Sequence, residues 1–490
     1  MSITIVGLGP AGPATIDATT LAALRDPGHT VILRTARHPA ADRLIDELGA
    51  TSCDDLYDEL EDFDGVYRAV ADRVVAAAEH GPVVYAVPGS PAVGERTVGM
   101  VVERAKDAGV DVTILPALSF LDLVYVEVGI DPIADGVQVL DARDLPDPLP
   151  LHVPTIITQV DSVLRSGDVA LALGRTLPDE TEVIVIDRLG DPDAVVASVP
   201  LHDLATYEGG ARTSVFVAAH DAGLLGLIAT NRILRASCPW DMKQTHHSLL
   251  SHLVEEAYET ADALGRLPAD APAGEADFGA YAEVEDELGD LLLQVVFHST
   301  LAAEAGAFDI DEVAEINRRK LVRRHPHVFG EVEVDGADEV LSNWEQIKQA
   351  EKGRDSLMDD VPTGMPAVAR AVKVQKRASS VGFDWDEAEP VFAVLASEVD
   401  ELREVVDDAD RASEELGDIL FAAINLARHL RVDPEVALRG AVDRFMGRFR
   451  HVEAEYHAAG RSMQEATLDE LDAAWHRAKI ATTDTPEQSA

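Results

Sequence analysis

Regularly spaced carboxylate side chains mark one stretch near the middle of this 490-residue sequence. The stretch contains Glu255-Glu256-Ala257-Tyr258-Glu259 and then Glu287-Leu288-Gly289-Asp290. Carboxylates three or four residues apart on one helix repel each other by roughly 0.2–0.5 kcal/mol per pair, a cost that a divalent cation would remove. Oxygen ligands that leave room for water and phosphate suit Mg²⁺ or Mn²⁺, whereas Zn²⁺ prefers His or Cys. We therefore predict a metal site with the ligands Glu256, Glu259, Glu287 and Asp290.

Two helices must position these carboxylates. Apolar residues recur every three or four positions around the first group, which predicts an amphipathic helix, at Leu249, Leu253, Ala257, Ala261 and Leu264. A denser apolar series runs from Val284 to Val296 and predicts a helix that is buried nearly all round, as in a bundle. The alternative is that the carboxylates form only the solvated face of a helix in a very acidic chain.

The carboxylate pattern occurs a second time. Ser397-Glu398-Val399-Asp400-Glu401 is followed by Glu415-Leu416-Gly417-Asp418 and by another apolar series. Glu415 follows Glu287 by 128 positions, and Asp418 follows Asp290 by the same number. This fixed offset indicates two modules of one design and favours a metal site over a solvated face. The predicted ligands of the second site are Glu398, Glu401, Glu415 and Asp418.

The overall composition is typical of a globular chain with several domains. A length of 490 residues predicts roughly three domains of about 150 residues, and 47% hydrophobic residues supply ordinary cores. The formal net charge of −48 disfavours binding to nucleic-acid polymers or anionic membranes. Cys53 and Cys238 lie far apart, so neither a disulfide framework nor a zinc knuckle is expected. Without a long apolar run or a signal-peptide pattern, the expected location is the cytoplasm.

Residues 1–222 are predicted to form an α/β domain. Short β-branched runs alternate there with helical stretches such as Val66–Glu79 and Glu95–Ala108. The expected strands are Ile3–Val6, Val31–Leu33, Val83–Val87, Val112–Leu115, Thr155–Ile157, Val183–Ile186 and Val215–Val217. Between Ala218 and Ile233 the composition changes to a helix of small residues, which we interpret as a connector.

Glycine loops end two of these strands. Gly7, Gly9 and Gly12 have the spacing of a dinucleotide-binding loop, in which glycines let the backbone approach a cofactor. Arg34 stands near the end of the second strand, where NAD binding requires an acidic residue; this removes support for NAD but leaves NADP open. A second loop, Val87-Pro88-Gly89-Ser90-Pro91, also ends a strand, so the two loops could face one cleft.

This region resembles the tetrapyrrole methylases. The resemblance rests on Gly7-Leu8-Gly9-Pro10, Val87–Pro91, Leu115-Pro116-Ala117-Leu118-Ser119-Phe120 and Thr158-Gln159, in the family's order. It implies S-adenosylmethionine binding between two α/β lobes, with contacts from Gly7, Gly9, Pro10, Pro88, Gly89, Ser90, Ser119 and Thr158. The family usually has glycine where Ala11 and Ala117 stand, so a retained fold with a lost or regulatory role is favoured over a working methyltransferase.

The two carboxylate modules resemble the MazG-type nucleoside triphosphate pyrophosphohydrolases. The first has Cys238-Pro239-Trp240-Asp241 and Gln244-Thr245-His246 before its carboxylates and Arg324–Phe329 after them. The second has Lys373–Ala378 and Val381–Trp385. The resemblance implies two all-α bundles, at about 230–350 and 360–480, that are completed by a partner in a homodimer. Residues 348–366 are interpreted as a linker and 481–490 as a disordered tail.

A run of cations stands out in this acidic chain. On the helix predicted for Asn317–Arg324, the side chains of Lys320, Arg323 and Arg324 fall on one side, where they could bind phosphate oxygens. The alternative is that they only balance the acidic bundle. The resemblance favours Lys320 and Arg324 as nucleotide-binding residues.

The second module has Arg444 and Arg448 in its corresponding basic run. Trp344 and Trp475 follow the two runs, and the resemblance places such a tryptophan beside the nucleotide. A tryptophan is more often a core residue, so that alternative stays open. His246 and its neighbour His247 lack convergent ligands for zinc and are predicted to be structural.

The reaction implied is hydrolysis of a nucleoside triphosphate to a monophosphate and pyrophosphate, as in house-cleaning of the nucleotide pool. Glu255, beside the ligands, is predicted to be the general base or the residue that orients the water, and Lys320 is the predicted catalytic cation. Ser397 replaces Glu255 and Arg444 replaces Lys320 in the second module, so we hypothesise that the first module carries most of the catalysis. Two alternatives remain open: a methyltransferase whose helical modules serve assembly, and a non-catalytic nucleotide sensor.

Overall fold

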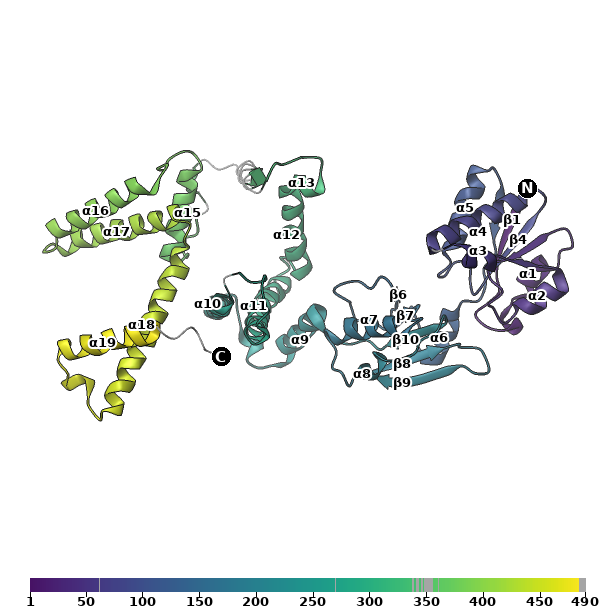
Figure 1. Cartoon of the computed structure of the whole chain (residues 1–490), viewed down its shortest axis with the longest axis horizontal. Helices are drawn as coiled ribbons and strands as arrows, with labels where there is room; N and C mark the ends of the chain where they lie inside the picture. Colours follow the sequence, from purple (N-terminus) through teal and green to yellow (C-terminus); the bar gives the residue numbers. More distant parts are fainter. Residues whose placement is uncertain are drawn as a thin grey trace. The chain divides into compact units, whose positions relative to one another are not determined.

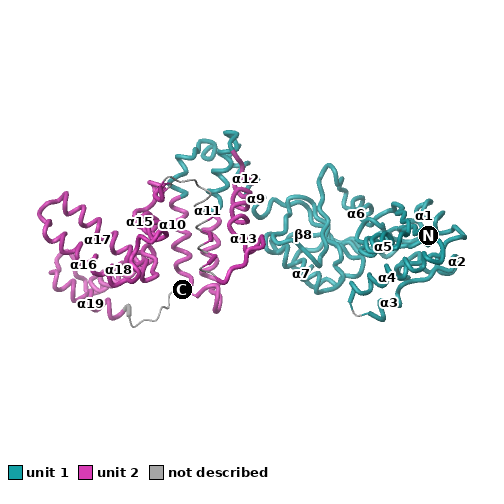
Figure 2. The backbone as a smooth tube through the Cα atoms, turned by 90° about the horizontal axis from the view of Figure 1, so that it is seen from above, with its two compact units in different colours: residues 1–253, 290–307 teal, residues 254–289, 308–490 magenta. Residues whose placement is uncertain are grey.

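An α/β region is followed by a helical region in the computed structural model (Figure 1). The structure describes residues 1–60, 62–268, 270–336, 339–340, 343–344, 347, 356–359 and 361–483. Its two units are Met1–Leu253 with Asp290–Ala307, and Val254–Gly289 with Phe308–Ala490 (Figure 2). The division passes through two continuous helices, α10 (Leu250–Arg266) and α11 (Phe278–Glu304). Within the described ranges, no helix is long and apolar enough to cross a membrane.

The first sheet is entirely parallel, with the strand order β3-β2-β4-β1-β5. Its strands are β1 (Ser2–Gly7), β2 (Thr30–Leu33), β3 (Thr51–Ser52), β4 (Val83–Val87) and β5 (Asp111–Ile114). Its helical segments are η1 (Pro13–Thr15), α1 (Ala18–Leu24), α2 (Ala41–Leu48), α3 (Asp54–Glu59), α4 (Phe63–Ala78) and α5 (Arg96–Asp107). Because β1, β4 and β5 are neighbours and parallel, the loops that follow them meet at one edge of the sheet.

Alternating side chains let helices cover both faces of this sheet. Ile5 and Tyr85 pack with α4 and α5, whereas their neighbours Val6 and Ala86 pack with α1 and α2. Figure 1 shows these two helix pairs on opposite sides of the strands. The near-continuous apolar strands of the sequence are therefore explained by burial on both faces.

The second sheet is mixed, with the strand order β6-β7-β10-β8-β9. Its strands are β6 (Gln138–Asp141), β7 (Thr155–Thr158), β8 (Glu182–Asp187), β9 (Val195–Pro200) and β10 (Thr213–Val217). Its helices are α6 (Phe120–Val128), α7 (Val163–Gly174) and α8 (Leu201–Leu204). Strands β3, β6 and β9 were not predicted, because β3 has two residues and the other two are partly exposed edge strands without a buried apolar run.

The helical region repeats one arrangement. The first module contains α9 (Gly223–Ser237), η2 (Asp241–Lys243), α10, α11, α12 (Ile310–Arg324) and α13 (Pro326–Phe329). The second contains α15 (Ala367–Ser379), α16 (Ala388–Glu404), α17 (Ala409–His429), α18 (Pro434–Ala458), η3 (Met463–Glu465) and α19 (Leu468–Thr483). Residues 481–483, predicted as part of a tail, are helical. Residues 484–490 and part of the predicted linker lie outside the described residues.

Helix α9 is more than the predicted connector. Its Asn231 is buried, and the side-chain oxygen accepts a hydrogen bond of 2.8 Å from the Thr300 hydroxyl on α11. In the same way, the buried Gln375 of α15 donates to the Phe421 carbonyl oxygen on α17 at 2.8 Å. Helix α9 is thus the first helix of its module, and the boundary predicted at residue 230 falls inside it.

The prediction that α11 is buried nearly all round is wrong for this chain. Val284, Val296 and Phe297 are buried, but Leu288 is 47% exposed and Leu292 is 40% exposed. The two leucines are four residues apart and therefore share one face of the helix. The apolar density of α11 is explained by a buried face plus an exposed apolar one.

Candidate metal centres and nucleotide-binding residues

Three of the four predicted ligands converge in the first module. One oxygen each from Glu256 on α10 and from Glu287 and Asp290 on α11 lie within 4.8 Å of one another. Glu259 lies outside this group, and its side chain is exposed. An oxygen cluster of this size matches the hard-ligand chemistry of Mg²⁺ or Mn²⁺.

A buried threonine fixes the two helices beside this cluster. The Thr260 hydroxyl lies 2.7 Å from the carbonyl oxygen of Glu256 and 3.1 Å from that of Glu287. It therefore joins α10 to α11 at the level of the carboxylates. The sequence signal was available, because Thr260 directly follows the Glu-Glu-x-x-Glu pattern, but a threonine in a helix is not by itself informative.

The second module brings a different set of three together. Glu398 and Glu401 on α16 and Glu415 on α17 each place an oxygen within 4.8 Å of the others. Burial and then the charges of Glu401, Asp418 and Glu415 raise the pKa of Glu398. Asp418 is therefore close enough to act electrostatically, although it is not among the three. Mutual repulsion in this second group is a cost that a cation would relieve.

The position of the predicted general base also differs between the modules. Ser397, which stands where the first module has Glu255, donates its hydroxyl to Glu401 at 3.0 Å. Glu255 is an exposed residue of α10, one position before the ligand Glu256. The serine is hydrogen-bonded to the predicted ligand Glu401, whereas Glu255 is the predicted general base of the first module.

The basic run of the first module is divided between two roles. Arg318 and Arg319 both pair with Glu315, and these hydrogen bonds lower the pKa of that carboxyl to about 2. These two arginines therefore balance acidic charge on their own helix. Lys320 is partly buried on the same helix, α12, and Arg323 lies in its last turn.

Arg324 and Trp344 lie against each other in the structure. The buried Arg324 places its guanidinium 5.3 Å from the centre of the Trp344 ring. The Trp344 ring also meets the His325 ring edge-on, with their centres 4.8 Å apart. This stacking is a cation–π contact, which favours arginine over lysine at position 324.

Trp475 has a different environment in the second module. Its ring lies 4.9 Å from that of Phe445, centre to centre, and it packs against the buried Val452 and Tyr456. Arg444 and Arg448 flank Phe445 on α18. The core alternative is therefore the better description of Trp475 in this chain.

An anchored aspartate follows the first helix of the second module. Asp384 accepts hydrogen bonds from Arg428 and His429, both on α17, with His429 at 3.0 Å. Although burial opposes ionisation, these bonds and one from Ser379 lower the pKa of Asp384 to about 2. Sequence reasoning noted the Gly-Phe-Asp-Trp motif but not this role, since the partners lie more than 40 positions away.

His246 has the structural environment that was predicted. Its Nδ1 lies 2.8 Å from Nδ1 of His298 on α11, and the two rings stack. Burial and the neighbouring His246 lower the pKa of His298. One ring must therefore be neutral to accept the shared proton.

The glycine loops of the first sheet meet as predicted. Gly9 and Gly89 form a bridge through two backbone hydrogen bonds of 3.1 and 2.9 Å. A Cβ on Gly7 would lie 2.3 Å from the Gly89 carbonyl oxygen and 2.6 Å from the Ala117 methyl group, so this position requires glycine. The loop of Ala117 therefore lies against the other two.

Two of the hydroxyls predicted to contact S-adenosylmethionine have partners within the protein. Ser119 caps α6, and the Thr158 hydroxyl donates to the Leu140 carbonyl oxygen at 3.1 Å. Arg34 is held by Glu95, at 3.3 Å, and by Tyr57, which removes the remaining support for NADP. Burial raises the pKa of Glu95 to about 7.

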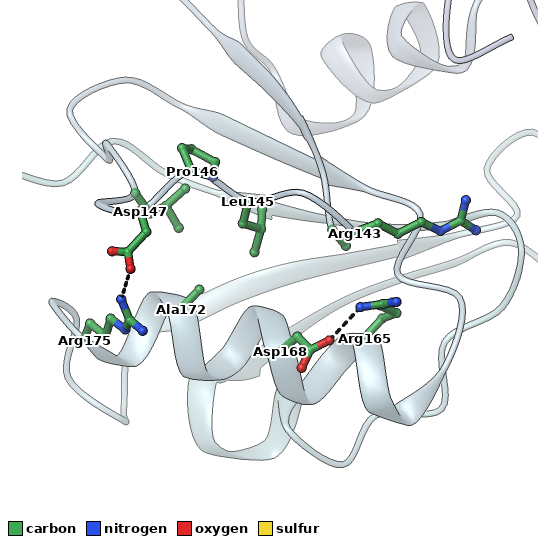
Figure 3. A pocket seen from close by; sticks show the side chains of 10 residues that line it. Arg143, Leu145, Pro146, Asp147, Arg165, Asp168, Ala172 and Arg175 are labelled. Carbon is green, nitrogen blue, oxygen red and sulfur yellow. Dashed lines mark hydrogen bonds and ion pairs between the residues drawn. The ribbon is translucent and has the colours of Figure 1, made fainter. Parts of the chain in front are cut away.

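A separate pocket of about 310 Å³ lies beside α7, under the loop that follows β6 (Figure 3). Leu145, Pro146 and Ala172 form its apolar middle, and Figure 3 shows arginine–aspartate pairs near its two ends. Each arginine there is already paired, for example Arg165 with Asp168 at 2.9 Å. None of the residues predicted to contact S-adenosylmethionine lines this pocket.

Family models match both the α/β region and the helical region of the chain. Residues 244–329 and 387–454 match the MazG nucleotide pyrophosphohydrolase domain. Residues 2–205 match the tetrapyrrole (corrin/porphyrin) methylases. The two MazG segments contain the two carboxylate groups, so the repeat found in the sequence is a repeat of this domain.

Three relatives show how the parts are combined elsewhere. The uncharacterized protein YabN of Bacillus subtilis is 36% identical over 97% of this chain and 98% of its own length. The nucleoside triphosphate pyrophosphohydrolase of Escherichia coli is 40% identical over 52% of this chain and 95% of its own length. The nucleoside triphosphate pyrophosphohydrolase/pyrophosphatase MazG of Thermotoga maritima is 40% identical over 53% of this chain and 97% of its own length.

Proposed function

The chain belongs to the MazG nucleotide pyrophosphohydrolase family, fused to a tetrapyrrole methylase domain, and from this premise we propose that it hydrolyses nucleoside triphosphates to monophosphates and pyrophosphate. The observation that carries the proposal is the pair of carboxylate groups on helices that also bear the family motifs. Removal of unwanted nucleotides is the expected role.

The first module holds the residues that this reaction needs. Glu256, Glu287 and Asp290 would bind Mg²⁺ or Mn²⁺, with Glu259 available from the next turn of α10. A bound divalent ion would neutralise phosphate charge and favour formation of a nucleophilic hydroxide from water. Glu255 would take the proton from that water, since it neighbours the ligands without being one of the three.

The triphosphate would extend toward the basic end of α12. Lys320, Arg323 and Arg324 supply positive charge, and a guanidinium matches phosphate oxygens in a bidentate manner. Trp344, beneath Arg324, would offer its remaining surface to the base. In the second module Arg444 and Arg448 would act on phosphate, with Glu398, Glu401, Glu415 and Asp418 around the metal.

A panel of nucleoside triphosphates with Mg²⁺ tests the proposal, with pyrophosphate and orthophosphate measured separately. Pyrophosphate and a monophosphate should appear in equal amounts. Chelation with EDTA should stop the reaction. Orthophosphate as the first product, or no turnover with any triphosphate, would contradict the proposal.

A second function, S-adenosylmethionine binding, is favoured by the bridge between Gly9 and Gly89. The glycine at position 9 has a φ of 73°, a conformation that costs other residues strain. We propose that this loop edge binds S-adenosylmethionine, and that methyl transfer is weak or lost because methyl groups of Ala11 and Ala117 occupy positions usually left open. Calorimetric titration should show saturable binding, which Gly9→Val should abolish.

The exposed face of α11 supports a homodimer. Leu288 and Leu292 lie on it, and α17 exposes Leu416 and Leu420 at the corresponding positions. Burying such side chains in an interface contributes about 25 cal/mol of stabilising free energy per Å² of apolar surface removed from water. Light scattering at micromolar concentration should give at least a dimer, and Leu292→Glu should shift it toward the monomer.

A further inference from the structure

One arginine holds the segment 238–249, called the turn below, which carries two motifs of the first module. Arg235, near the end of α9, precedes the matched residues 244–329. Its Nη1 donates to the backbone carbonyl oxygens of Asp241 and Gln244, the latter at 3.2 Å. Asp241 ends the Cys-Pro-Trp-Asp motif, and Gln244 begins Gln-Thr-His. The guanidinium thus binds the backbone of both motifs.

The same guanidinium binds α11. Its Nε and Nη2 donate to the two carboxylate oxygens of Glu304 at 2.8 and 2.9 Å. Glu304 is the last residue of α11, the helix that bears Asp290. The Arg235 side chain is 17% exposed, whereas that of Glu304 is 47% exposed, so the arginine is the shielded member of a two-bond ion pair at the end of α11.

Two more contacts join the turn to α11. His246 meets His298 through their Nδ1 atoms at 2.8 Å, and the buried Leu249 packs with Phe297 and Leu301. Helix α10 begins at Leu250, directly after the turn. Helix α10 is rigid and continues directly from the turn. The way the turn is held against α11 therefore determines where the carboxylates of α10 lie.

The second module achieves the same connection with different residues. There the turn residue Asp384 is held by Arg428 and His429, which belong to α17 itself. An arginine therefore ties the turn to the second carboxylate helix in both modules, but the first module takes it from α9. Two independent solutions to one connection indicate that the connection matters to the site.

We infer that Arg235 is a positioning residue of the first metal centre, which sets the α10 carboxylates against those of α11 by clamping the motif turn to Glu304. This inference rests on the proposed hydrolytic function. Arg235 touches neither metal nor nucleotide, and its effect passes through the turn.

The test uses the full chain carrying Glu415→Gln, so that the second module contributes little. Arg235→Gln should lower kcat about tenfold with KM changed less than about twofold, since small displacements of catalytic groups cost rate more than binding. Arg235→Lys should recover part of the loss. Glu304→Gln should give an intermediate loss, because the contacts to the two carbonyl oxygens remain.

Arg232→Gln is the matched control, an exposed arginine one turn earlier on α9. Amide hydrogen exchange over residues 238–249 should rise in Arg235→Gln and not in the control. Affinity for Mn²⁺, measured without nucleotide, should fall in the same variant. The inference is overturned if Arg235→Gln equals Arg232→Gln in kcat, exchange and Mn²⁺ affinity.

The two proposals can fail separately. A parent protein that releases no pyrophosphate from any triphosphate contradicts the hydrolytic function. In that case exchange and Mn²⁺ affinity alone decide whether Arg235 positions the carboxylates.

Discussion

The two helical modules carry carboxylates at the same four positions but bring different sets of three together. The first uses one residue of α10 and two of α11, and the second uses two of α16 and one of α17. The ligand types are therefore inherited with the motif, while their convergence depends on the neighbours. The difference shows that a complete motif does not by itself fix which of its carboxylates converge.

Two neighbouring positions also differ between the modules. Thr260 joins the backbones of α10 and α11, whereas the corresponding residue of α16 is Leu402, which cannot form such bonds. Ser397 in turn holds Glu401 by a hydrogen bond that Glu255, as a carboxylate, could not donate. The first module thus fixes its helices, and the second fixes one ligand.

The largest effect is expected from removing one ligand charge. Glu287→Gln keeps the volume but removes a metal-binding charge, so total hydrolysis should fall at least about 100-fold if the first module dominates. Glu415→Gln, the matched change, should leave most activity. Steady-state pyrophosphate release at saturating Mg²⁺ measures both. The reverse order of the two variants would assign catalysis to the second module.

The next effect concerns Glu255, the proposed general base. Glu255→Ser should lower the activity of the first module by about 10²–10⁴-fold if that group is the general base, with little change in Mn²⁺ affinity. The reciprocal Ser397→Glu, made in the Glu287→Gln background, should raise the activity of the second module. Unchanged rates in both variants would remove Glu255 from the mechanism.

A smaller effect on stability is expected from the Asp384 anchor. The carboxyl has a pKa lowered to about 2, so its stabilising contribution is fully present above about pH 4 and is lost as the pH falls through 2. Asp384→Asn should therefore destabilise the second module by about 2 kcal/mol at pH 7. Urea denaturation followed at pH 7 and at pH 2.5 should show this difference shrinking at the lower pH.

The smallest effect is expected at the helical glycines between the paired carboxylates. A Cβ on Gly289 or Gly417 would meet nothing within 4 Å, so alanine should stabilise each helix by about 0.5–1 kcal/mol in the isolated chain. Thermal unfolding measures this gain. If Gly289→Ala loses activity or dimerisation and Gly417→Ala does not, a ligand or partner approaches only the first helix.

Much of this protein was determined by local sequence. Short β-branched runs indicated the α/β strands, and apolar residues every three or four positions indicated the carboxylate helices, because each pattern reflects which faces are buried. The strand-end glycines were recognisable from their spacing. The structure gives the reason for one of them, because a Cβ has no room at Gly7. The repeat was recognisable because one offset of 128 positions separates Glu287 from Glu415 and Asp290 from Asp418.

How those pieces meet depends on contacts between segments that are distant in the sequence. The tertiary structure assigned α9 to the first module, because Asn231 and Arg235 reach residues 69 positions away on α11. It separated Trp344, beneath Arg324, from Trp475, which packs in a small core. It also selected which three of four carboxylates converge. Contacts between distant segments depend on the relative placement of helices, and local spacing carries no information about that placement.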